Sequence, residues 1–366
     1  MRAPSPTHAL DALDRVRSHA LAWAAARPHI FPWVRSREAR VLLRAYVAIG
    51  VALVLALVAP CAALALGPLV LGVPHVAASV RYLVLRQKMH PAYIAALVVA
   101  CLGLVGARVV TLVSDPGAAI VLTAVRVEVS LGCALAATSA IVGVASGGSV
   151  RRGAFAVAVL VALALVLVVF PYAGRLAFVH LHNLGVVALW VALFRHKKAV
   201  RVVVALFAGL AIVCLVPPLS VASFGGVAFD DVAAWLAPNA SPRLAAALVL
   251  AHVYTDSIHY AFWLGVVPDQ ALRGEGSLTF AQTLRGLGRD FGRMLPWVLL
   301  ASLAVPALAM LGAEMARRVY FSFFGFHGYV EGATLVLAFV RGTSPVEERE
   351  VERAAPTSRG RACVGE

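Results

Sequence analysis

Two histidines and an aspartate share one face of a helix that the sequence predicts over residues 243–267. His252, Asp256 and His259 have the spacing i, i+4, i+7, and because an α-helix turns about 100° per residue they fall on a single stripe. The surrounding run is apolar. An ionisable group at bilayer depth costs on the order of 2.5 kcal/mol or more unless it is paired, bound to a metal or facing water. The stripe therefore predicts a functional site, or else a polar seam between neighbouring helices.

Other histidines lie at similar depth in the predicted membrane-spanning runs. The six histidines inside such runs are His75, His180, His182, His252, His259 and His327. With a rise of 1.5 Å per residue, His182 and His252 lie about 13 Å and His327 about 12 Å from the outer ends of their helices, and His75 roughly 15 to 20 Å. Four helices can thus bring imidazoles to one layer. His180 and His182 are about 200° apart around their helix, so only one can face that layer; we favour His182, with Asn183 near the His180 face.

A carboxylate accompanies the last of these histidines. Glu331 follows His327 by one turn of the predicted helix, where it can bind a metal directly or orient the imidazole through its second ring nitrogen. Alternatively, Glu331 pairs with Arg126 of an earlier run. Pro74 precedes His75 and should kink that helix.

The composition is that of a polytopic membrane protein. Of 366 residues, 61% are hydrophobic and 14% are charged, far from the balance of soluble domains. We predict an all-α bundle of about ten transmembrane helices over residues 41–341, after a basic segment at 1–40 with a candidate interfacial helix and before a disordered tail at 342–366. The apolar runs, each about 20 residues long, are 42–60, 62–85, 92–113, 118–146, 153–171, 174–194, 200–221, 243–267, 295–313 and 319–340.

The net charge of +14 is explained by basic residues in the loops between the predicted membrane-spanning runs. Basic residues gather in alternate short loops, for example Arg86 with Lys88, and Arg151 with Arg152, and such loops face the cytoplasm. This pattern predicts both termini inside a bacterial inner membrane and gives no reason to expect a nucleic-acid partner. Arg317 and Arg318 depart from it, because they fall on the outer side between the last two runs.

These motifs resemble those of a membrane enzyme family. Gly72-Val73-Pro74-His75, isolated histidines in later runs and a histidine pair on a late helix resemble the Brp/Blh-type, β-carotene dioxygenase-like proteins, in which four histidines on separate helices hold an iron that cleaves β-carotene with dioxygen. The resemblance implies a metal held by His75, His182, His252 and His259. It leaves as neighbours or alternate ligands Asp256, His327, Glu331, His180 and Asn183. The segment His259–Leu264 also resembles uncharacterised bacterial membrane proteins.

The chain departs from that family after His75, where Val76 replaces the usual glycine and no acidic residue follows closely. We therefore expect a non-haem iron, dioxygenase-like oxidoreductase whose substrate is an apolar lipid or isoprenoid-like molecule from the bilayer. Two alternatives remain: a haem protein with two axial histidines, and a proton-coupled carrier with titrating His and Asp side chains. No HExxH, GxSxG or Walker motif occurs in the sequence, which disfavours zinc proteases, serine hydrolases and ATPases.

The alternation of basic loops predicts that reporter proteins fused after Arg201 and after Pro238 will lie on opposite sides of the membrane. Alkaline phosphatase and green fluorescent protein fusions measure this directly. The same reporter active at both positions would contradict the ten-helix scheme and the common depth of the histidines.

Overall fold

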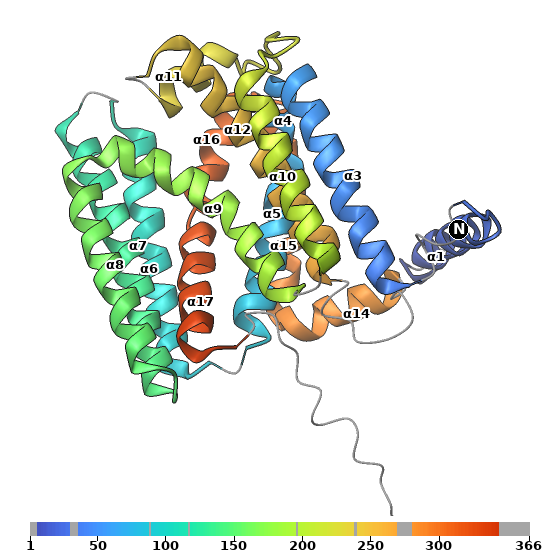
Figure 1. Cartoon of the computed structure of the whole chain (residues 1–366), viewed down its shortest axis with the longest axis horizontal. Coiled ribbons are helices and arrows are strands. Elements are labelled where there is room, and N and C mark those ends of the chain that lie inside the picture. Colours follow the sequence, from blue (N-terminus) through green and yellow to red (C-terminus); the bar gives the residue numbers. More distant parts are fainter. Residues whose placement is uncertain are drawn as a thin grey trace, which may run out of the picture.

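The chain folds into a bundle of helices, as predicted (Figure 1). The computed structural model describes residues 6–29, 36–87, 89–115, 118–194, 197–237, 240–268 and 280–343. The helices that build the bundle are α3 (Arg37–Val58), α4 (Pro60–Leu66), α5 (Gly72–Val80), α6 (Pro91–Val113), α7 (Ala119–Ala145), α8 (Val150–Val169), α9 (Pro171–Leu193), α10 (Lys197–Leu215), α12 (Pro242–Ala261), α15 (Leu295–Ala309), α16 (Ala313–Phe324) and α17 (His327–Arg341).

Each of the ten predicted apolar runs overlaps a helical part of the chain, although residues 216–221 of the seventh run lie beyond the end of α10. Among the described residues, eight stretches are long and apolar enough to cross a membrane: Glu38–Val58, Pro60–Leu85, Pro91–Val113, Ala119–Ala145, Val150–Val169, Leu176–Leu193, Gln282–Ala309 and Ala313–Arg341. The other two runs form α10, whose apolar part is the shorter Val200–Leu215, and α12, which carries the His/Asp stripe.

Helix boundaries follow local chemistry. Proline occupies the first turn of α4, α6, α9, α12 and α15. In the first turn a backbone N–H has no acceptor within the helix, so proline loses no hydrogen bond there, and its fixed φ suits a helix. Serine side chains cap α3, α8 and α12 by accepting a backbone N–H, the usual N-cap role of this residue. Gly342, with φ of 71°, ends α17 in the left-handed conformation, as helix-terminating glycines commonly do.

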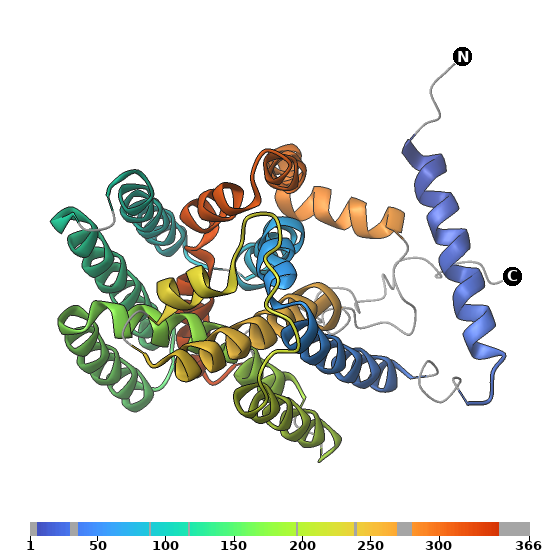
Figure 2. The same ribbon diagram turned by 90° about the horizontal axis from the view of Figure 1, so that it is seen from above.

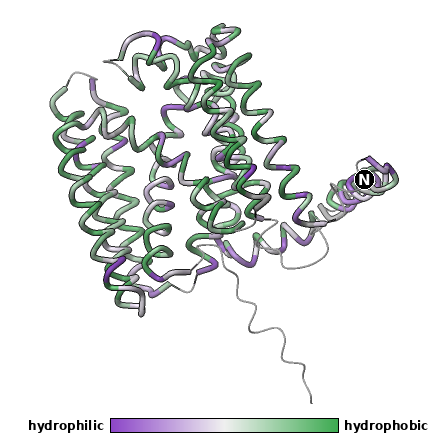
Figure 3. The backbone as a smooth tube through the Cα atoms, in the orientation of Figure 1, coloured by the Kyte–Doolittle hydropathy of each residue, from purple (hydrophilic) through white to green (hydrophobic). Residues whose placement is uncertain are grey.

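The two larger of the four apolar clusters among the described residues lie on either side of the bundle's centre. One core joins α3, α9, α10 and α12, and includes Trp190, Tyr254 and Trp263. The other joins α6, α7 and α17 around Leu104 and Ala333. In Figures 1 and 2, α9 runs obliquely between these two groups of helices, and α17 lies inside. Residues of high hydropathy predominate along the outer helices, as the colouring of the backbone in Figure 3 shows. The centre, where α5, α9, α12 and α17 approach one another, is left for polar residues.

The basic loops lie at one end of the bundle. The end of α5, the turn between α7 and α8, and α14 (Phe280–Phe291) are at the bottom of Figure 1, whereas α11 (Phe229–Leu236) is at the top. Arg317 and Arg318 lie within α16, not in a loop as predicted, because α16 begins at Ala313. The Arg317 guanidinium is buried and pairs with Glu314 at 3.1 Å, so its charge is neutralised inside the fold.

α1 (Pro6–Ala25) lies beside the bundle and packs on α14, where the Phe280 N–H donates to Asp14 Oδ1 at 2.9 Å (Figure 2). The Arg81 Nε in turn binds Asp290 of α14 at 2.6 Å. The interfacial location of α1 stays a prediction. Residues 344–366, most of the predicted tail, lie outside the described residues, as do residues 1–5 and 30–35 of the basic segment.

The last predicted run, 319–340, is not one helix. α16 ends at Phe324 and α17 begins at His327, so the helix is interrupted inside the bundle. The Arg108 side chain stabilises this break, because its Nη1 donates a hydrogen bond to the carbonyl of Phe321 at 2.8 Å. A Cβ on residue 325 would collide with Arg108 Nη1, so glycine at this position makes room for the guanidinium. Arg108 also binds the Glu128 carboxylate through Nε at 2.8 Å and Nη2 at 2.6 Å.

Glu128→Ala should strongly destabilise the protein. The change leaves the Arg108 guanidinium, only 17% exposed, without a counter-charge, which costs about 3–5 kcal/mol for buried ion pairs. Arg126→Ala on the same helix is the matched control, because Arg126 is exposed and surface changes cost about 0.5 kcal/mol or less. Unfolding in mixed SDS micelles measures both. Equal losses would show that the Arg108–Glu128 pair does not hold the break.

Candidate metal centre

His75 lies on the most irregular helix of the bundle. π-helical turns at Gly67–Leu71 and Arg81–Leu85 flank the short α5 on which it sits, and such turns occur frequently at functional sites. Pro74 immediately precedes it. The result is an imidazole that is only 1% exposed and faces the centre of the bundle.

His327 is the first residue of α17, directly after the break. Its Nδ1 lies 2.6 Å from the carbonyl oxygen of Phe324, and this hydrogen bond places the proton on Nδ1. The opposite nitrogen, Nε2, is therefore left as an electron-pair donor, and it lies 2.9 Å from Nε2 of His75. A carbonyl that fixes the tautomer of an imidazole is the usual support of a histidine ligand.

His182, His259 and Glu331 complete the group. Glu331 Oε2 lies 3.4 Å from His182 Nδ1 and 3.6 Å from His259 Nε2. The His182 ring centroid is 4.4 Å from that of His259 and 5.0 Å from that of His327. Four helices, α5, α9, α12 and α17, therefore supply imidazoles to one layer, and α17 adds a carboxylate. The depth estimate predicted this for His75, His182 and His327, but for α12 it placed His252 in the layer, whereas the structure brings His259 there.

These donor atoms fall into two groups of three that share His259, and each group could hold an ion. The nearest atoms of His75, His259 and His327 all lie within 4.8 Å of one another, as do those of His182, His259 and Glu331. Adjacent ligands at metal–nitrogen distances of about 2.1 Å lie roughly 3.0 to 3.4 Å apart in octahedral or tetrahedral geometry. The buried His/Glu group can therefore hold a metal ion after small side-chain movements.

Several of these polar atoms lack a protein partner. Both ring nitrogens of His259 and Oε1 of Glu331 are buried without a hydrogen bond among the described residues. An unsatisfied buried polar group costs about 1–3 kcal/mol, and native structures contain few of them. The two nitrogens of one imidazole point in different directions, so a single ion would use only one of them, and His259 Nε2 is the one that lies beside Glu331 Oε2.

The structure places His252 outside this group. Asn183 Nδ2 donates to His252 Nδ1 at 3.3 Å and lies 3.4 Å from Thr255 Oγ1, and the His180 ring centroid is 6.2 Å from that of His252. The physical reason is axial distance. Residues i and i+7 share a face, but about 10 Å of helix separates them, too far for His252 and His259 to bind one ion.

His252, His180 and Asn183 therefore form a second polar group, one to two turns of α12 from the first. Asp256 faces a third direction and interacts with the Tyr260 hydroxyl. Glu331 lies beside two histidines and not beside Arg126, whose Nε donates instead to the carbonyl of Val168 at 3.2 Å.

Two residues that support the site were missed from the sequence. Arg108 stabilises the break in the helix before His327, as described above. Tyr329 lies on the helical turn between His327 and Glu331, and its hydroxyl donates a hydrogen bond of 3.0 Å to Glu128 Oε1. The available signal was an arginine within the apolar run 92–113, which needs an intramembrane partner. Glu128 of the next run supplies it.

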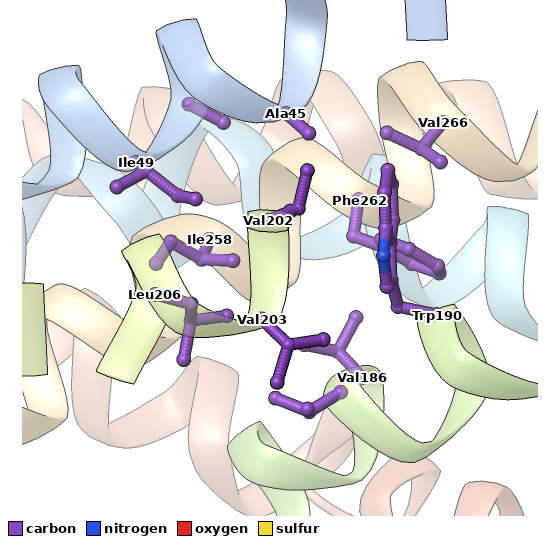
Figure 4. Close-up of a pocket in the computed structure, with 12 residues that line it drawn as sticks. Ala45, Ile49, Val186, Trp190, Val202, Val203, Leu206, Ile258, Phe262 and Val266 are labelled. Atoms are coloured by element: carbon purple, nitrogen blue, oxygen red, sulfur yellow. The ribbon is translucent and has the colours of Figure 1, made fainter. Parts of the chain in front are cut away.

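A small apolar cavity lies on the other side of α12 (Figure 4). Its volume is about 30 Å³, and it lies between α3, α9, α10 and α12, with Val186, Trp190 and Ile258 in its wall. Ile258 precedes His259, so the two point about 100° apart. The cavity has the volume of about one water molecule and is lined by apolar side chains, so it is not the metal centre.

Comparison with family models, with curated proteins and with solved structures finds no match to this chain.

The two sets of candidate ligands predict different mutant behaviour. We expect His75→Ala and His327→Ala each to abolish stoichiometric metal binding, because both imidazoles lie in the group that can hold an ion. His252→Ala should retain the metal and lose only the stability of its interhelical hydrogen bond, about 0.6 to 2 kcal/mol. Elemental analysis of folded protein after size-exclusion chromatography measures this. Metal loss in His252→Ala with retention in His327→Ala would favour the ligand set from the sequence.

Proposed function

We propose that the protein is an intramembrane metal enzyme, in which a non-haem iron held by histidines acts oxidatively on an apolar lipid or isoprenoid-like molecule. The observation that carries the proposal is the donor group of four imidazoles and one carboxylate, buried in the bundle with ligand-like spacing. A structural polar seam needs one or two such groups. The five polar side chains gathered here, from four helices, are more than a seam between helices requires.

The chemistry of the donors favours iron. Neutral imidazole together with carboxylate is the ligand type of non-haem Fe(II) oxygenases, and such an iron supplies dioxygen activation when it has open coordination positions. The resemblance of Gly72–His75 to the Brp/Blh-type proteins agrees with this assignment. Calcium and magnesium are disfavoured, because these ions prefer oxygen ligands.

Haem fits the site less well. Two axial histidine nitrogens on opposite sides of an iron are about 4 Å apart, with the flat macrocycle between them. The Nε2 atoms of His75 and His327 are 2.9 Å apart, and the rings of His182 and His259 pack directly beside them. These rings occupy the space that a macrocycle would need.

The chain's own residues account for the environment of the metal. Phe324 orients His327 through its carbonyl oxygen, and the Arg108–Glu128–Tyr329 network anchors α17 on both sides of that histidine. Phe178 stacks on Tyr329 with ring centroids 4.0 Å apart and covers the His182 ring at 6.0 Å. The aromatic cover and the flanking cores exclude bulk water, which favours chemistry on an apolar substrate.

We also propose that the substrate enters from the bilayer. Leu184, Val187 and Ala188 of α9 line an apolar groove that Phe207 of α10 borders on the outer surface. Val187 also lines the small cavity of Figure 4. Both features lie one to two turns from His182 along α9, so a separation of α9 from α10 would open a lateral path. In this proposal the basic end of the bundle, with both termini, faces the cytoplasm.

Purified protein should contain about one iron per chain and should show no Soret band. Its visible spectrum together with elemental analysis tests the proposal. A Soret band would favour the haem alternative. Protein without metal after expression in iron-supplemented medium would favour the proton-coupled carrier.

Oxidative activity has its own test. Reconstituted protein with membrane lipid extract should consume dioxygen, and mass spectrometry should detect oxygenated or cleaved apolar products. His327→Ala should abolish both signals, whereas His252→Ala should retain them, because only His327 belongs to the group that can hold the metal. Equal activity in the two variants would contradict the assignment.

A further inference from the structure

α14 lies across the basic end of the bundle, whereas α15, which follows it, runs along the bundle (Figure 1). The view from above also shows α14 lengthwise (Figure 2). Gly292, with φ of 52°, lies at the turn between the two helices, in a conformation that residues with a side chain rarely adopt. α14 therefore lies where a bilayer around the spanning helices has its surface.

Opposite faces of α14 differ in chemistry. With a rotation of about 100° per residue, one stripe of the helix is apolar and consists of Phe280, Leu284, Leu287 and Phe291. Arg285 and Arg289 lie one turn apart on the opposite face, and both are exposed. Phe291 is buried, but Phe280 is 43% and Leu284 is 38% exposed. The bundle thus covers only one end of the apolar stripe.

Ion pairs fix the rotation of α14 about its own axis. The Asp290 carboxylate binds Arg81 Nε at 2.6 Å and Arg86 Nε at 3.0 Å. Gly286, one turn earlier, makes room for Arg81, because a Cβ there would lie 2.9 Å from Nη2 of that arginine. This side of α14 is about 100° from the apolar stripe and about 100° from the basic face, so the exposed part of each remains outside the contact.

The charge of this region is complementary to an anionic membrane surface. α14 and the turn after it carry Arg285, Arg289 and Arg293 but one acid, Asp290, whose carboxylate is engaged by the two arginines of the bundle. Arg289 Nε lies 3.7 Å from the same carboxylate, yet its side chain is 65% exposed. Trp297, at the start of α15, is 72% exposed, and tryptophan is enriched at membrane interfaces.

We propose that α14 is an interfacial helix that binds the headgroup of an anionic phospholipid through Arg285 and Arg289, with Phe280 and Leu284 among the acyl chains. Amphipathic helices bind membranes through buried apolar area and attraction to anionic lipids. A guanidinium suits the lipid phosphate because it donates two parallel hydrogen bonds to it. The inference goes beyond the proposed function, because it requires no metal.

Native mass spectrometry of the full chain, titrated with phosphatidylglycerol in a neutral detergent, measures the Kd for the lipid. Arg285→Gln and Arg289→Gln should each raise this Kd about fivefold, the change expected when one arginine near an anionic surface is lost. Arg151→Gln and Arg201→Gln are the matched controls. Both are exposed arginines at the same end of the bundle, on α8 and α10, and they should leave the Kd unchanged.

An unchanged Kd in both α14 variants would overturn the proposal, and so would an equal rise in the control variants, which indicates attraction to net charge alone. Displacement of the lipid by an equal concentration of inorganic phosphate would also overturn it, because the site would then bind a free anion. The apolar face has a separate test that needs no arginine variant. A fluorescent amino acid encoded in place of Leu284 should be quenched by phospholipids with brominated acyl chains, and no quenching would place this stripe outside the bilayer.

Discussion

The architecture depends on the cost of placing polar side chains inside an apolar bundle. Histidines, glutamates and arginines in such surroundings must be paired, hydrogen-bonded or bound to a ligand. The structure satisfies this requirement by gathering them between two apolar cores. Arg108 and Glu128 neutralise each other there, whereas the histidines and Glu331 retain unpartnered atoms. That difference separates the structural polar group from the candidate functional one.

Irregular helices are what bring the donors together. Straight helices present side chains at fixed intervals of rotation and rise. Side chains from several straight helices therefore seldom point to the same place. The π-helical turns around α5 and the break between α16 and α17 relax that restriction. The break also allows the Phe324 carbonyl, left without a partner in its own helix, to bind the His327 ring.

The surroundings of the site divide into three sides with different chemistry. Phe178 and Tyr329 provide an aromatic cover, the Tyr260 ring packs against His75, and His252 with Asn183 forms a separate hydrogen-bonded group. In the proposed function, an apolar substrate would approach from the groove between α9 and α10.

Hydropathy and spacing along the sequence were sufficient for the all-α bundle, for the apolar runs and for the common depth of His75, His182 and His327, because these depend on burial and on the constant rise of a helix. Spacing also singled out the α12 stripe, but shared rotation does not mean shared position, and only the tertiary structure separates His252 from His259. The break before His327 and the pairing of Arg108 with Glu128 depend on contacts between residues distant in sequence. Helical periodicity within one segment contains no information about such contacts.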